Sequence, residues 1–219
     1  MTQAMVRAMG AGLILLCAMA TTGCLAAQIP TSAPPPTATS SPVPVPSEGP
    51  GWVGGDLTYA AGSDLDPATY IEWADGMAMS DAYEVDSPDD GNGHWSHTHI
   101  ATGCVASFWQ GTLADYDLTG GDQSLSDQVL AHDFQEETAK ISAAAGDVDI
   151  AITSGSVVQM RAVTGQNEQG TTYVVLARGF STLSAALYFS LDCPTGQDAV
   201  DVFDEVRNDF SVYITPAAG

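Results

Sequence analysis

Three histidines lie in the segment HWSHTH, which begins at His94. Because side chains alternate between the two faces of a strand, His97 and His99 would share one face, and a turn could bring His94 toward them. Imidazole nitrogens bind Zn²⁺, Cu²⁺ or Ni²⁺, and an oxygen of Asp89 or Asp90 could complete such a site. The spacing matches no recognised structural-zinc pattern, so we favour a solvated strand and turn and keep a zinc or copper site as the alternative.

The remaining polar motifs do not predict a catalytic site. Segment 86–92 combines acidic residues with a glycine but lacks the closing acidic residue of an EF-hand. Ser181 lies in GFSTL, which lacks the second glycine of a nucleophile elbow, so it is better interpreted as a turn residue. Glu136 and Glu137 are adjacent, and a helix would project them in different directions. Without a phosphate-binding loop or a dinucleotide fingerprint, we expect the chain not to be an enzyme.

The N-terminal segment has the layout of a signal peptide. Arg7 is the only charge before the apolar run 9–20, and the run is followed by TTGC, which ends at Cys24. This run is shorter than the roughly 20 residues that a transmembrane helix needs. The ending resembles the lipobox of bacterial lipoproteins, in which a small residue precedes a cysteine that is diacylated. That resemblance implies a signal peptide over residues 1–23 and a lipid anchor on Cys24, at the extracytoplasmic face of the cell membrane.

One position departs from the lipobox. Thr21 stands where that motif usually has leucine, and ordinary cleavage near Ala26 and Ala27 would instead release a secreted domain. We favour lipidation because the alternative site lacks small residues at both positions that ordinary cleavage requires. Two acyl chains, at about 0.8 kcal/mol per buried methylene, would make the membrane attachment stable.

Residues 24–50 form a linker that cannot build a core. Segment 27–50 holds eight of the twelve prolines and no aromatic residue. Proline favours an extended helix of about 3.1 Å per residue, so the linker could hold a domain up to roughly 70 Å from the bilayer. The serines and threonines among the prolines also permit O-glycosylation.

Residues 51–219 have the size of one domain, and the charge of this region restricts its partners. The chain contains 27 acidic residues and five Lys and Arg residues, and all acidic residues follow Cys24. The fixed positive charges of the domain are Lys140, Arg161, Arg178 and Arg207. Nucleic acid is excluded as a partner, because its binding depends on Lys and Arg. We favour a solvated acidic surface, and attraction of cationic partners is the second interpretation.

Two cysteines, Cys104 and Cys193, remain in the domain once the signal peptide and Cys24 are set aside. An exported protein meets an oxidising compartment, so we expect these two to form a disulfide. Two buried free thiols are the alternative, since free cysteine packs as a small hydrophobic residue.

Apolar residues alternate over 148–152, and turn or loop residues separate the segments 157–163, 172–180 and 185–193 that follow. This pattern predicts an antiparallel meander of four strands. Three shorter strands are predicted over 82–86, 95–101 and 104–109. Ser124 with Asp127 predicts the start of one helix, and Thr195 with Asp198 the start of a second that carries Ala199, Phe203, Val206 and Phe210 on one face. The region 51–81 is less clear, although Asp66 and Pro67 could begin a helix.

The fold class predicted is therefore α+β, an antiparallel sheet covered by two helices. This order of elements, with the sequence Cys193-Pro194, a helix and then Phe210-Ser211-Val212, resembles the PsbP-like fold of LpqN-type lipoproteins of actinobacteria. The resemblance covers roughly 57–214 and implies a non-enzymatic binding or assembly factor. No motif of that family maps onto a functional residue here.

We therefore expect a non-catalytic binding or assembly module of the cell envelope, with an envelope protein or a small ligand as its partner. An extracytoplasmic metal-binding protein that uses His94, His97 and His99 is the second hypothesis, and a hydrolase is the third. Trp73, Trp95 and Trp109 are candidate anchors for a partner where they are exposed.

Overall fold

The computed structural model describes residues 54–216, so the expectations for residues 1–23, Cys24 and the linker 24–50 lie outside the described residues. In chain order, the elements are α1 (Tyr59–Gly62), β1 (Tyr70–Asp75), η1 (Met77–Met79), β2 (Tyr83–Ser87), β3 (His94–His99), β4 (Val105–Thr112), η2 (Leu118–Gly120), α2 (Gly121–Phe134), α3 (Thr138–Ala144), β5 (Gly146–Ala151), β6 (Val157–Gln166), β7 (Thr172–Phe180), η3 (Ser181–Leu183), β8 (Ala185–Cys193), α4 (Ala199–Val206) and β9 (Phe210–Thr215).

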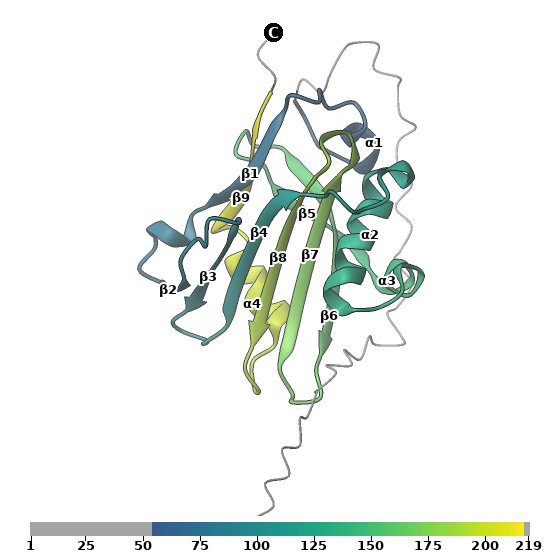
Figure 1. Cartoon of the computed structure of the whole chain (residues 1–219). Coiled ribbons are helices and arrows are strands. Elements are labelled where there is room, and N and C mark those ends of the chain that lie inside the picture. Colours follow the sequence, from purple (N-terminus) through teal and green to yellow (C-terminus); the bar gives the residue numbers. More distant parts are fainter. Residues whose placement is uncertain (1–53, 217–219) are drawn as a thin grey trace, which may run out of the picture.

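Seven strands form one antiparallel sheet in the order β2-β3-β4-β8-β7-β6-β5, and β1 pairs with β9 in a separate antiparallel ribbon (Figure 1). The α+β class is confirmed, and so are the seven strands predicted for 82–109 and 148–193, with shifted ends. Alternation of apolar residues in β5, and apolar runs bounded by turn residues in β6, β7 and β8, made these strands visible in the sequence.

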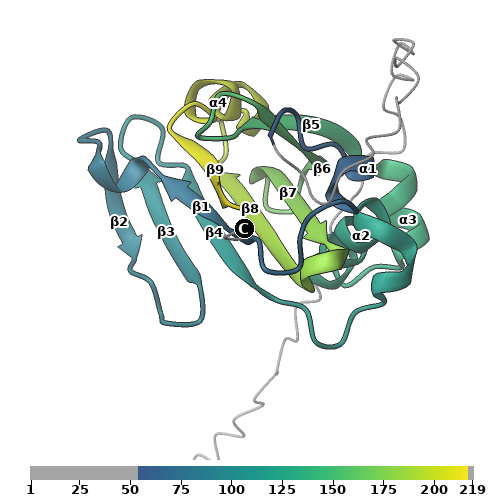
Figure 2. The ribbon, with the colours of Figure 1, turned by 90° about the horizontal axis from the view of Figure 1, so that it is seen from above.

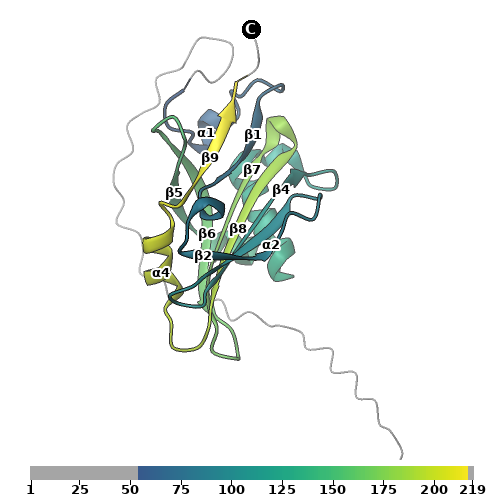
Figure 3. The ribbon, with the colours of Figure 1, turned by 90° about the vertical axis from the view of Figure 1, so that its left-hand side faces the viewer.

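Each face of the sheet has its own cover. Helices α2 and α3 lie on one face, and α4 lies on the other together with β1 and β9 (Figures 2 and 3). On β7, Val175 and Ala177 pack toward α2, while Val174 and Leu176 pack into the core beneath α4 and β9. Strands β2 and β3 lie at the end of the sheet away from α2 (Figure 1). The face that carries α2 is therefore covered over only part of its width.

Helix α2 begins earlier than predicted, because the polar residues interpreted as a capping box lie inside it. Asp127 is 3% exposed, and its carboxylate accepts a hydrogen bond from Arg161 Nε at 2.6 Å. Asp122 is equally buried and accepts from Arg178 Nη2 at 2.8 Å. The buried side of α2 thus carries charged residues beside Leu125. The sequence of this helix therefore lacks the usual periodicity of apolar residues.

The C-terminal helix is shorter than predicted. Asp198 caps α4 by accepting from the main-chain N–H of Val200 at 2.9 Å, and the helix ends at Val206. Phe210 was expected on the same helical face, but it begins β9 and pairs with Asp75 of β1. No helix begins at Asp66, which instead caps the turn before β1. Ribbon β1-β9 was missed because its two strands lie at opposite ends of the domain sequence.

Candidate functional site

The three predicted histidines of β3 do not converge. His97 and His99 lie on the face that carries β1 and α4, as the alternation predicts. His94 belongs to the other face, where its ring stacks against Trp109 with the centroids 6.0 Å apart. The expected turn does not bring His94 round, because His94 is already the first residue of the strand and pairs with Trp109 of β4.

His97 has a structural role. Its side chain is buried, and Nε2 lies 2.6 Å from Asp75 Oδ2, an oxygen that also accepts from Trp95 Nε1 at 2.8 Å. Asp75 therefore ties β3 to β1. His99 contacts Thr102 through Nδ1 at 2.9 Å and packs against the ring of Tyr83.

No group of three potential metal ligands from His, Cys, Asp and Glu occurs within residues 54–216. Of the carboxylates suggested as additional ligands, Asp89 accepts from the main-chain N–H of Gly91, and Asp90 accepts from that of Asn92. Asp90 also lies 3.4 Å from His94 Nδ1, so the structure brings only these two of the predicted ligands together. The geometry gives no support to a zinc or copper site built from His94, His97 and His99.

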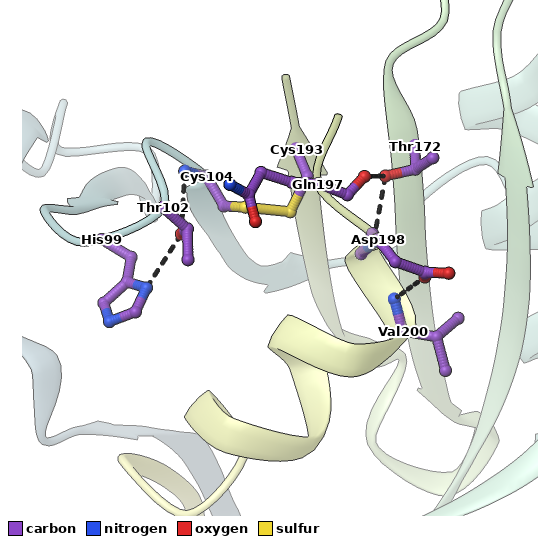
Figure 4. The surroundings of a disulfide bond; sticks show 9 residues. His99, Thr102, Cys104, Thr172, Cys193, Gln197, Asp198 and Val200 are labelled. Carbon is purple, nitrogen blue, oxygen red and sulfur yellow. Dashed lines mark hydrogen bonds between the residues drawn. A yellow bond between two sulfur atoms is a disulfide. The ribbon is translucent and has the colours of Figure 1, made fainter. Parts of the chain in front are cut away.

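Cys104 and Cys193 form a disulfide (Figure 4). The residue after Cys104 pairs with the residue before Cys193 on the antiparallel strands β4 and β8, so the two cysteines stand opposite each other with Cα atoms 4.2 Å apart. Both are fully buried. Nearby, Thr172 Oγ1 donates to the carbonyl of Gln197 and accepts from the N–H of Ala199, which holds the start of α4 against β7. The bridge is a structural tie between the two halves of the sheet.

A pocket of about 600 Å³ occupies the part of the sheet face that α2 leaves uncovered. We call it the open-face pocket, and its walls include Asp90, His94, Trp109, Tyr116, Asp133 and Tyr188. Trp109 pairs with His94 on β3 and with Tyr188 on β8, so these three rings stand in one row across the sheet. The neighbouring row supplies the serines Ser96 and Ser107.

Glycine at position 111 sets the orientation of the Trp109 ring. A Cβ atom at Gly111 would lie 2.7 Å from Cζ2 of the indole, so the ring extends over the main chain of its own strand. Trp109, Tyr116 and Tyr188 are all partly buried, and each keeps some surface toward the pocket. The floor of the pocket is therefore aromatic.

The polar wall of the pocket comes from the C-terminal half of α2 and from the loop before β3. Asp133 accepts a hydrogen bond from the Tyr188 hydroxyl at 2.8 Å. Although Asp133 stays open to solvent at the pocket mouth, desolvation by the surrounding protein raises the pKa of its carboxyl, and the hydrogen bond from Tyr188 opposes this only in part. Main-chain N–H groups, that of Asn92 foremost, lower the pKa of Asp90. Two carboxyl groups with opposite shifts thus border the aromatic floor.

Among residues 54–216, no serine hydroxyl hydrogen-bonds to a histidine ring. Ser96 donates to Asp86 at 2.9 Å, and Ser181 donates to Asp122 at 2.7 Å. Ser181 therefore helps to hold α2 against the turn after β7.

Of the three tryptophans proposed as anchors, Trp109 and Trp95 line the pocket and Trp73 does not. Trp73 is 5% exposed and donates through Nε1 to the main-chain carbonyls of Trp109 and Tyr188, each at 3.1 Å. The Trp95 ring stacks on Phe108 on the opposite face of the sheet. Tyr116, Asp133 and Tyr188 were not predicted as site residues from the sequence. The sequence held a usable signal only for Tyr188, because this residue lies in a predicted strand on the same face as Ser190.

No protein-family model, curated protein or solved structure matches the chain. Among residues 54–216, none of the helices has the length and apolar character needed to cross a membrane.

Proposed function

We propose that this chain is a membrane-anchored, non-catalytic binding module of the bacterial cell envelope, and that its ligand site is the open-face pocket. One observation carries the proposal: the sheet face beyond α2 holds a pocket of about 600 Å³ with three partly buried aromatic rings. Sites for small ligands are typically clefts of roughly 300–1,000 Å³ lined by aromatic side chains and a few polar groups.

The anchoring part of the proposal rests on the sequence. Gly23 and Cys24 match the lipobox, and the proline-rich residues that follow suit a tether. The disulfide between Cys104 and Cys193 fits an oxidising compartment. A mixed fold with helices on both faces of an antiparallel sheet is compatible with the PsbP-like assignment, which remains part of this proposal.

Ligand-observed NMR with a panel of neutral, anionic and cationic fragments tests the binding site on the full chain in a non-ionic detergent. We expect one charge class to bind and the Trp109→Ala variant to lose at least about tenfold in affinity, as truncation of a buried aromatic anchor typically does. Val200→Ala is the matched control, because Val200 is an exposed apolar residue on α4, across the sheet. Failure of every class to bind, or equal binding by Trp109→Ala, contradicts the proposal.

Detergent-phase partitioning tests the anchor separately. The wild-type chain expressed in a bacterium that lipidates proteins should enter the detergent phase, and Cys24→Ala should remain in the aqueous phase. Partitioning of Cys24→Ala into detergent contradicts the anchor without affecting the pocket.

A further inference from the structure

We propose that the open-face pocket binds an organic cation of the alkylammonium class, with the cationic group held between the aromatic floor and Asp133. This inference rests on the proposed function, because it names the ligand class of the same pocket. It follows from three features of the pocket: its charges, its rings and the small number of its metal-type ligands.

The carboxylates in the pocket lack a Lys or Arg partner, although His94 Nδ1 lies 3.4 Å from Asp90 Oδ2. Asp133 and Asp90 border the pocket, and neither Lys nor Arg lines it. Every Lys and Arg between residues 54 and 216 forms an ion pair elsewhere: Lys140 with Glu136, Arg161 with Asp127 and Asp147, Arg178 with Asp122, and Arg207 with Asp204. The pocket carboxylates can thus be neutralised only by His94, by His132 or by a ligand. An anionic ligand would meet repulsion without a fixed positive charge to offset it.

The rings favour an organic cation over a metal ion. The faces of Trp and Tyr attract alkylammonium groups through their ring quadrupole, and such groups bind between several rings. Trp109, Tyr188 and Tyr116 line one pocket, and the Tyr188 hydroxyl hydrogen-bonds to Asp133, which holds a carboxylate beside a ring. No group of three metal ligands occurs in the described chain, so a bare divalent ion finds too few partners here.

Two imidazole rings adjoin the aromatic floor. His94 lies beside Trp109, and His132 lies beside Tyr116 with the ring centroids 6.1 Å apart. Both histidines line the pocket and extend its aromatic walls.

Calorimetry with choline, on the full chain in a non-ionic detergent, tests the inference. The matched probe is 3,3-dimethylbutan-1-ol, which replaces the nitrogen of choline by carbon and carries no charge. We expect choline to bind at least roughly tenfold more tightly than the neutral probe at low salt, since cation–π and ion-pair contributions depend on that charge. Asp133→Asn should weaken choline binding by a similar factor, because it removes the negative charge. The asparagine side chain still offers an oxygen that can accept the hydrogen bond from the Tyr188 hydroxyl.

Two variants separate the site from general charge and folding effects. Asp149→Asn removes the same charge from the exposed edge strand β5, at the far end of the sheet, and should leave choline binding unchanged. Gly111→Ala displaces the Trp109 ring without removing it and should weaken choline binding.

Equal affinity for choline and the neutral probe, or an equal loss in Asp149→Asn and Asp133→Asn, would overturn the inference. Should neutral or anionic fragments bind in a Trp109-dependent manner while choline does not, the cation assignment fails and the binding module stands. If no fragment binds, both proposals fail.

Discussion

Neutralising Asp122 should destabilise the domain strongly, because Arg178 is a buried cation with one charged partner. The Arg178 side chain is 0% exposed, and its guanidinium donates to Asp122 Oδ2 at 2.8 Å and to the carbonyls of Gln159 and Thr58. It also lies 4.4 Å from the centroid of the Tyr59 ring. Of these contacts, only Asp122 supplies a full negative charge.

Asp122→Asn removes that charge and also replaces Oδ2, which accepts from Arg178, by an amide N–H group that cannot accept. The asparagine keeps an oxygen that can accept from Ser181, as Asp122 Oδ1 does at 2.7 Å and 2.9 Å. Breaking a buried pair typically costs about 3–5 kcal/mol, because one charge is left uncompensated. For a domain of this size, such a loss corresponds to a fall in Tm of roughly 6–20 °C. Removing Arg178 as well should recover part of the loss, since no buried charge then remains.

Chemical denaturation of the single variants and of Asp122→Asn with Arg178→Met measures this coupling. We expect the double variant to cost less than the sum of the two single variants by at least about 1 kcal/mol. Glu136→Gln is the control, because its partner Lys140 is half exposed and surface pairs contribute about 1 kcal/mol or less. The reasoning would be refuted if Asp122→Asn lowered the free energy of unfolding by less than about 1 kcal/mol, or if the losses of the two single variants added up in the double variant.

Three further predictions concern the bridge, the packing of α2 and the pocket carboxyl. Replacing Cys104 and Cys193 by Ala should lower the free energy of unfolding by up to about 4.5 kcal/mol, from the loop entropy of an 89-residue separation, measured by denaturation. Gly179→Ala should cost roughly 1–3 kcal/mol, because its Cβ would lie 2.5 Å from Leu125 Cγ. Asp133→Asn should raise Tm at pH 7, and the gain should vanish near pH 3.

The sign of the pH effect follows from the raised pKa of Asp133. The folded state binds the proton more readily than the unfolded state, so the wild type loses stability as the pH rises through the folded-state pKa, and the asparagine variant does not. A gain that persists at pH 3 argues against this cause. For the packing prediction, Gly146→Ala is the matched control, since its Cβ would have no neighbour within 4 Å. If reduction of the disulfide between Cys104 and Cys193 leaves the Tm unchanged, the prediction that this bridge stabilises the domain is wrong.

The strands were predictable because short apolar segments bounded by turn residues are a local signal. Val157 to Cys193 reads as apolar runs separated by turns, and these became β6, β7 and β8. The start of α2 was predicted too late in the chain. From the sequence alone, an aspartate such as Asp127 that caps a helix cannot be distinguished from one that binds a buried arginine. Ribbon β1-β9 depends on a pairing between Trp73 and Val212 that no local pattern encodes.

The candidate site could not be predicted for a related reason. The pocket gathers Trp109 from β4, Tyr116 from a loop, Asp133 from α2 and Tyr188 from β8, and only the strand order brings them together. In contrast, the histidine cluster of β3 was prominent in the sequence, yet the alternation of the strand divides it between two faces. A cluster in sequence is therefore a poor guide to a cluster in space on a β-strand.

The most direct test of the open-face pocket as a site for an organic cation is the indole N–H resonance of Trp109 during a titration with choline. Trp95 serves as the internal reference, because its indole donates to Asp75 on the opposite face of the sheet. We predict a saturable shift of the Trp109 resonance, little change for Trp95, and loss of the shift in Asp133→Asn. A Trp109 resonance that does not move, or that moves together with Trp95, would contradict the account.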